Sequence, residues 1–158
     1  MILNESLEFD SIADVRVRRA FIGGRPEVKV RLDTGTKLYK WTSHGLVVPV
    51  TPWWSFVDSQ ILSNGSRVAG FREVEERAKR LGRAPRDFAR VRSAVTKQWN
   101  GMNRLVWIQL RTPAYGFAGK ALGQKEDETV ENVYLIGGEY QLWIPNLTLQ
   151  HVHKVAPT

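Results

Sequence analysis

The sequence predicts an α+β domain with a mainly antiparallel, split sheet and a central pair of basic helices. Three observations predict this class: extended patterns near both ends of the chain, helical periodicity in the middle third, and no repeat or linker within the 158 residues. A chain of this length buries roughly two thirds of its unfolded surface, so it forms a core without disulfides. We expect a single domain over residues 1–158, with an N-terminal lead-in (1–25), strands (26–63), basic helices (67–101) and further strands (104–155).

The first strands are expected between Pro26 and Pro52. Residues 28–32 alternate between apolar and basic side chains, residues 33–35 have turn composition, and residues 37–41 resume the extended pattern. This arrangement predicts a hairpin. A short strand is expected over residues 46–50, and a less regular stretch follows it.

Two consecutive helices are expected in the middle of the chain. Apolar residues recur at three- and four-residue spacing from Phe71 to Leu81, and Gly82 is a suitable C-terminal cap. Pro85 suits the first turn of a second helix, whose apolar stripe ends at Trp99.

The last third returns to extended patterns. Strands are expected over residues 104–111, 133–136, 140–144 and 147–155, and the last of them alternates in polarity. Residues 120–132 are polar and glycine-containing, which predicts a loop.

The positive charge is concentrated in the helical region. Residues 67–111 hold 12 Lys and Arg against four acids, a charge of +8, and the remaining 11 bases and 12 acids sum to −1. One interpretation is a surface that attracts polyanions, nucleic acid above all, through Arg77, Arg80, Arg86 and Arg90. The other is a solvated helical face that binds nothing.

Several kinds of chemistry are excluded by composition. The chain has no cysteine, which rules out a disulfide framework, a Cys-ligated zinc, an iron–sulfur cluster and thiol catalysis. It has no Walker loop, Rossmann fingerprint, His-Glu-x-x-His or Gly-x-Ser-x-Gly motif. His151 and His153 would share one strand face, but no third ligand lies near them in the sequence, so a structural role is favoured over a metal site.

Membrane insertion and a signal peptide are not expected. Apolar runs are far shorter than the roughly 18 residues that span a bilayer, and acidic residues occupy the N-terminal stretch where a signal peptide would be basic. We expect a soluble protein, either cytoplasmic or secreted into a target cell by a route that needs no signal peptide.

Five short segments carry the functional interpretation when they are taken together and in order. They are Leu-Tyr-Lys-Trp at residues 38–41, Pro-Trp-Trp-Ser at 52–55, the segment 99–110 that opens with Trp-x-x-Met, the small residues of 113–124, and Gly-Gly-Glu-Tyr-Gln at 137–141. In this arrangement the chain resembles the ADP-ribosyltransferase-like, NAD-consuming domains of bacterial polymorphic and secreted toxins. The resemblance covers roughly residues 36–155.

The family pattern is matched with two departures. Such domains place an aromatic residue and a base on a first strand, a Ser, Thr or aromatic segment on a second, and Glu or Gln on a later one. Here Lys40 follows Tyr39 where the family usually has Arg, and a lysine meets a phosphate only as a point charge. Gln141 stands where the transferases have a carboxylate, and Glu139, two residues earlier on the same strand, would supply one.

The resemblance implies cleavage of the bond between nicotinamide and ribose, with ADP-ribose passed to a macromolecule. NAD is then the substrate, and no metal or bound cofactor is required. Breaking this bond builds positive charge on the sugar, so positioning and electrostatic stabilisation would do most of the work. The implied catalytic residues are Gln141 and Glu139, and the implied NAD-binding residues are Tyr39, Lys40, Trp53, Trp54 and Ser55.

Alternatives remain open at this point. The enzyme would be an NAD glycohydrolase if water were the acceptor, and the ADP-ribose acceptor would otherwise be a protein or a nucleic acid such as RNA. In another class, the chain would be a non-enzymatic basic module that binds nucleic acid. The resemblance further implies an acidic immunity or inhibitor protein as a partner for the basic face. Purely structural roles are the competing interpretation for Lys40, for Trp53 and Trp54, and for Gln141.

Overall fold

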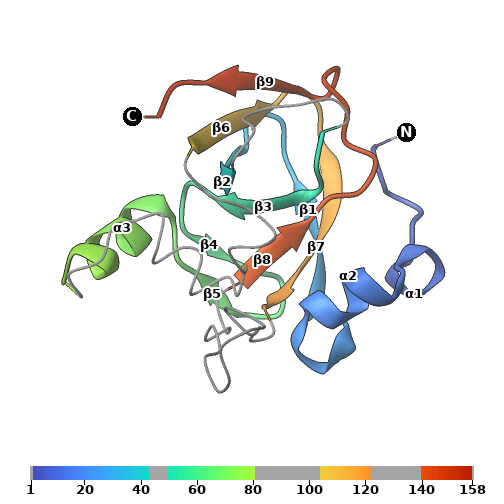
Figure 1. Ribbon diagram of the computed structural model, residues 1–158. Helices are drawn as coiled ribbons and strands as arrows, with labels where there is room; N and C mark the ends of the chain where they lie inside the picture. Colours follow the sequence, from blue (N-terminus) through green and yellow to red (C-terminus); the bar gives the residue numbers. More distant parts are fainter. Residues whose placement is uncertain (1, 43–49, 81–103, 122–139, 158) are drawn as a thin grey trace, which may run out of the picture.

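Residues 2–42, 50–80, 104–121 and 140–157 are described by the computed structural model, and the account below is confined to them. They form a seven-stranded sheet, a two-stranded sheet and short helices (Figure 1), which confirms an α+β fold with a mainly antiparallel sheet. In chain order the elements are α1 (Phe9–Ile12), α2 (Val15–Ala20), the 3-10 turn η1 (Ile22–Gly24), β1 (Val28–Leu32), β2 (Lys37–Thr42), β3 (Trp53–Phe56), β4 (Gln60–Ile61), β5 (Arg67–Val68), α3 (Phe71–Arg80), β6 (Arg104–Leu110), β7 (Ala114–Lys120), β8 (Tyr140–Trp143) and β9 (Val152–Val155).

The large sheet has the order β1-β7-β8-β3-β2-β6-β9, and its strand pairings are antiparallel. The predicted hairpin over residues 28–41 is wrong, although both of its strands form. β1 pairs with β7, while β2 pairs with β3 and β6. The turn between β1 and β2 changes the direction of the chain, and the Gly35 N–H there donates to the Leu110 carbonyl at 2.9 Å. Two long segments, β1–β2 and β6–β7, therefore run side by side from one half of the sheet to the other.

One face of the bent sheet, the inner face, encloses the main core. Apolar side chains from alternate positions of the strands meet there, among them Leu38, Trp54, Ile108 and Leu142. These four residues are at most 2% exposed, so the strands are held mainly by apolar burial on this side.

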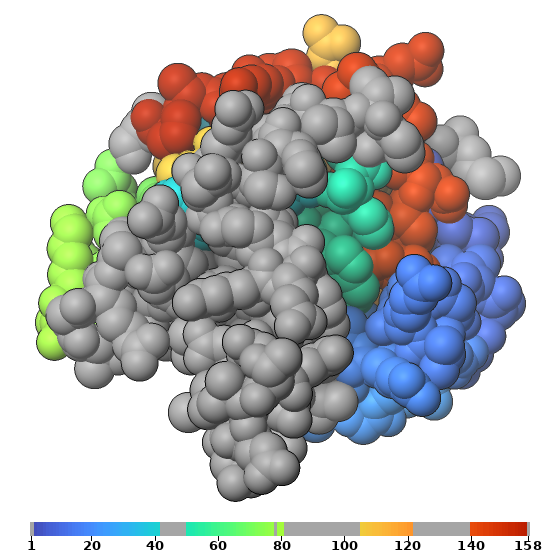
Figure 2. Space-filling model, in the orientation of Figure 1, coloured from blue at the N-terminus to red at the C-terminus, as the bar shows by residue number. Residues whose placement is uncertain are grey.

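The opposite face, the outer face, is covered in part by the N-terminal helices. Phe9 and Phe21 pack on Phe117 and Trp143, with Phe9 touching each of the other three rings edge-on at 5.6 to 5.8 Å. Figure 2 shows the side chains of this N-terminal region, in blue, next to those of β3 and β8, in green and red. The described part of the N-terminal lead-in, residues 2–25, therefore covers one part of the outer face.

Helix α3 covers another part of the outer face. Its first residue, Phe71, lies against Tyr39 and Trp107 with ring centroids 4.9 and 5.2 Å away. The helix expected from Phe71 to Leu81 is confirmed over the described residues Phe71–Arg80. The second predicted helix, which starts at Pro85, lies outside the described residues, so a central helix pair is not established.

The remaining sequence expectations have mixed outcomes. β6 and β8 confirm two of the predicted strands, whereas β3 and β7 lie within the stretches expected to hold strands but were not predicted from their own patterns. The expected strand over residues 147–155 is confirmed only at β9. Residues 149–151 form a turn, and before it the Thr148 N–H donates to His151 Nδ1 at 3.0 Å. The strands expected over residues 46–49 and 133–136 lie outside the described residues, and Val50 is not in a strand.

Candidate functional site

Three of the five segments, those at residues 38–41, 52–55 and 137–141, reach neighbouring strands, with β3 between β2 and β8. Tyr39 of β2 lies opposite Ser55 of β3. The pairing of Trp53 with Trp143 and of Trp54 with Leu142, continued by one residue, places Gln141 on the other side of Ser55. Tyr39, Ser55 and Gln141 thus form one cross-strand row, here called the motif row.

The motif row lies on the outer face. Side chains alternate between the two faces along a strand, and Tyr39 packs with Phe71 on the outer side, while Leu38 belongs to the inner core. Directly opposed side chains on neighbouring strands have Cβ atoms about 5 Å apart. The three side chains therefore start close to one another and on the same side of the sheet.

Gln141 is held by the N-terminal region. Its Nε2 donates to the carbonyl oxygen of Ala20, the last residue of α2, at 2.7 Å. This bond fixes the amide plane, and within the described part of the chain no hydrogen bond engages Oε1. The side chain therefore offers an oriented acceptor beside Ser55, and α2, an element that the sequence interpretation had not used, supplies the orientation.

The two aromatic neighbours of Ser55 differ in exposure. Tyr39 is buried beneath Phe71, so its ring is covered on the outer face of the sheet. Trp53 is half-buried on the same face, next to Trp143 and Phe21 at centroid distances of 6.2 and 5.5 Å. The half-buried Trp53 ring and the Ser55 hydroxyl group thus lie on β3, the strand next to Gln141.

Lys40 and Trp54 are brought together on the opposite face. The Lys40 Nζ atom lies 4.4 Å from the centroid of the Trp54 ring, and Trp54 is 2% exposed with its Nε1 donating to the Thr51 carbonyl at 2.8 Å. Burial lowers the pKa of Lys40 from 10.5 to about 8. The structure therefore does not bring Lys40 and Trp54 into one cleft with Gln141, because residues adjacent along a strand point to opposite faces.

Only part of the expected basic surface is described. Arg77 and Arg80 lie in the second half of α3, which follows three acidic residues, and two of these acids form ion pairs with Arg67 and Lys79. Arg86, Arg90 and the candidate catalytic residue Glu139 lie outside the described residues. The segments outside the description hold six bases and six acids, so the described residues carry 17 bases, 10 acids and the full +7.

Within the described ranges, no group of three or more His, Asp or Glu side chains is placed to hold a metal ion. His153 Nε2 lies 3.1 Å from Gln109 Oε1. No helix in the same ranges is long and apolar enough to cross a membrane.

Comparison of the chain with protein-family models, with curated proteins and with solved structures finds no match.

Proposed function

We propose that this protein cleaves NAD between nicotinamide and ribose and transfers ADP-ribose to a macromolecular target, using an ADP-ribosyltransferase-like fold. The observation that supports the proposal is the motif row. Three segments far apart in the chain, each part of the family resemblance, lie on adjacent strands, with Tyr39 opposite Ser55 and Gln141 one residue beyond the last pair between β3 and β8.

The residue types of the row fit the reaction. The glycosidic C–N bond breaks, its electron pair leaves with nicotinamide, and ribose C1 gains a bond to the acceptor atom, which loses a proton. Gln141 Oε1, oriented through the bond of Nε2 to Ala20, would accept a hydrogen bond from a ribose hydroxyl. The Ser55 hydroxyl would hold the substrate beside it, and the half-buried Trp53 would form an aromatic wall for the nicotinamide ring.

Lys40 has no part in this form of the proposal. The resemblance implied that it meets the pyrophosphate, but its ammonium group lies over Trp54 on the inner face. The positive charge for the phosphates must then come from the outer face. Water as the acceptor in place of a macromolecule would make the protein an NAD glycohydrolase, and the site requirements are the same.

The test is to incubate the pure protein with NAD, with and without cell lysate, and to measure free nicotinamide by chromatography. We expect release above the buffer rate, together with labelling of a lysate protein or RNA when the NAD carries a label on its adenylate part. Release without labelling would assign a glycohydrolase. No release under either condition would overturn the proposal, and salt-sensitive binding of nucleic acid in its place would support the non-enzymatic alternative.

Variants connect the activity to the row. Ser55→Ala and Gln141→Ala should each lower nicotinamide release at least tenfold, while Gln150→Ala, on an exposed turn, should leave it unchanged. Gln141→Ala also loses the bond to Ala20, which costs about 1 kcal/mol of stability, so melting temperatures are measured in parallel. If all three variants released nicotinamide at the wild-type rate, Ser55 and Gln141 would have no role in the reaction.

A further inference from the structure

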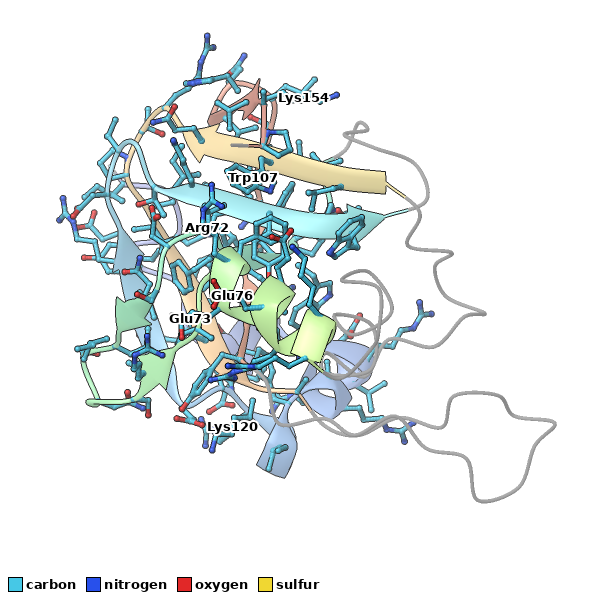
Figure 3. The ribbon with its side chains drawn as sticks, turned by 90° about the vertical axis from the view of Figure 1, so that its left-hand side faces the viewer. Arg72, Glu73, Glu76, Trp107, Lys120 and Lys154 are labelled. Atoms are coloured by element: carbon cyan, nitrogen blue, oxygen red, sulfur yellow. The ribbon has the colours of Figure 1, made fainter. Side chains whose placement is uncertain are left out.

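The short hairpin of β4 and β5 turns at an exposed Asn-Gly sequence. Its tip, residues 63–66, is closed by the Leu62 N–H, which donates to the Ser66 carbonyl at 2.8 Å. Asn64 and Gly65 are both exposed, and Gly65 has a positive φ of 86°, a backbone conformation that favours glycine. Figure 3, which looks onto α3, shows this hairpin in green next to the helix. The Asn-Gly sequence is therefore presented to solvent in a defined turn.

An asparagine followed by glycine loses its side-chain amide group without an enzyme. The backbone nitrogen of the glycine attacks Cγ of the asparagine, the bond from Cγ to Nδ2 breaks, and the proton of the attacking nitrogen leaves with the amide group as ammonia. Water then opens the resulting succinimide ring at either of its carbonyl groups, which gives aspartate or isoaspartate. Glycine favours the attack because it has no Cβ to crowd the nitrogen or to restrict the backbone.

The Asn64 side chain connects the hairpin tip to Glu27, which directly precedes β1. Its Nδ2 donates to Glu27 Oε1 at 3.1 Å, and its Oδ1 accepts from the Ser66 N–H at 3.1 Å. The same Glu27 oxygen accepts from Ser66 Oγ at 3.3 Å and from the hydroxyl group of Tyr140, the first residue of β8, at 2.7 Å. One carboxylate oxygen thus receives three donors, two of which come from the hairpin tip.

Deamidation would reverse the sign of the interaction with Glu27. In aspartate a negatively charged oxygen replaces Nδ2, which lies 3.1 Å from Glu27 Oε1, so a donor is lost and two carboxylates face each other. In isoaspartate the backbone of the tip is also longer by one methylene group. Either product would detach the tip from Glu27, while Leu62 and Val68, each 5% exposed, keep the base of the hairpin in the main core.

The attack requires a brief opening of the hairpin tip. In the closed tip the Gly65 N–H donates to the Leu62 carbonyl at 2.8 Å, and both polar atoms of the Asn64 amide group are hydrogen-bonded. These bonds lie at the surface, where water competes with them, so the tip opens more easily than the core does. The bond from Asn64 to Glu27 therefore slows the reaction that would break it.

We propose that Asn64 is a site of spontaneous deamidation, and that the carboxylate formed there releases the hairpin tip from Glu27. Water is the other reactant, and ammonia is the product that leaves. The reaction is irreversible, so the released form accumulates as the protein ages. The inference does not depend on NAD cleavage by the motif row.

Mass spectrometry of the aged protein tests the site. The wild type is incubated at 37 °C and pH 7.4 for several weeks, digested with trypsin and compared with a fresh sample. Cleavage after Lys40 and Arg67 gives a peptide in which Asn64 is the only asparagine. We expect this peptide to gain the mass difference between NH₂ and OH and to separate into aspartate and isoaspartate forms. Asn146 is the internal control, because it is exposed but precedes Leu147, and it should react at least roughly tenfold more slowly.

Paired variants test the consequence for the fold. Asn64→Asp places one of the products in every molecule and should lower the melting temperature by about 2–4 °C. In a Glu27→Gln background the same substitution should have a much smaller effect, because the second carboxylate is absent. Gln150→Glu, the same change from amide to carboxylate on an exposed turn, should not lower the melting temperature. Glu27→Ala should speed the gain of mass at Asn64, because it frees Nδ2.

Three results would overturn the proposal. They are a gain of mass at Asn64 no faster than at Asn146 in the folded wild type, an unchanged melting temperature in Asn64→Asp, and an equal loss in the wild-type and Glu27→Gln backgrounds. The first would mean that the folded tip excludes the attack, and the other two that a carboxylate at residue 64 does not meet Glu27.

Discussion

Replacing Lys40 by Met removes an ammonium group from the inner face of the sheet and keeps the aliphatic stem that packs there. Burial lowers the Lys40 pKa from 10.5 to about 8, which corresponds to roughly 3 kcal/mol of destabilisation of the charged form. The attraction between Nζ and the Trp54 ring, 4.4 Å away, offsets about 0.5–2 kcal/mol of this penalty. At pH 7 we therefore expect Lys40→Met to raise the free energy of unfolding by about 1–3 kcal/mol and the melting temperature by about 3–8 °C.

The sign of the pH dependence follows from which state holds the proton. Between pH 8 and 10.5 the folded protein has released the Lys40 proton while the unfolded chain keeps it, so the stability of the wild type rises with pH across this window. Below pH 8 Lys40 is charged in both states, so the full cost of burying its ammonium group lowers the stability of the folded wild type. The difference in free energy of unfolding between Lys40→Met and the wild type should therefore be constant from pH 6 to about 8. It should then shrink toward zero near pH 10.5.

The assay is urea unfolding followed by tryptophan fluorescence at pH 7 and at pH 10, with Lys154→Met as the control for loss of one positive charge at an exposed position. A Lys40→Met variant that is less stable than the wild type at pH 7 would refute the reasoning, as would a stability gain that does not change with pH. The same variant should release nicotinamide at a rate within twofold of the wild type, because Lys40 lies on the face opposite to the motif row.

Two further predictions concern the residues at the starts of helices α3 and α2. Gly70→Ala should lower the free energy of unfolding by about 1–3 kcal/mol, because a Cβ there would lie 2.6 Å from the Val57 carbonyl oxygen and 2.7 Å from the Ser59 nitrogen; unchanged denaturant midpoints would contradict this. Asp14→Ala should cost about 1 kcal/mol, because its carboxylate accepts the Arg16 and Val17 N–H groups at the start of α2, and thermal unfolding measures the loss.

Much of the fold was predictable where the pattern is local. α3 and β6 were found because helix and strand periodicities are properties of a single segment. The Trp-Trp-Ser-Phe strand β3 was not predicted as a separate strand because it is only four residues long, and its side chains do not alternate between apolar and polar as its burial does. The N-terminal helices were missed because α1 and α2 have four and six residues, too short for a periodic signal.

The candidate site was predictable only in part. The motif segments were identified in the chain, but the role of α2 in orienting Gln141 has no signal in the sequence, since Ala20 contributes only its backbone carbonyl. The Asn-Gly pair at residues 64–65 is visible in the sequence, but its link to Glu27 is not, because Glu27 and Asn64 are 37 residues apart.

The sequence by itself determined the class of the fold and the strand and helix segments with clear periodicity, because periodicity is a local property. Side-chain alternation along a strand is local too, but the expected NAD-binding set used both Tyr39 and Lys40 and did not apply it. The tertiary structure alone decided which strand pairs with which, and so whether Ser55 lies between Tyr39 and Gln141 and which face of β2 points into the core. The physical reason is that any extended segment can satisfy its backbone hydrogen bonds with any other. The choice between partners is made by the apolar surface that all strands bury together, and no single segment contains that information.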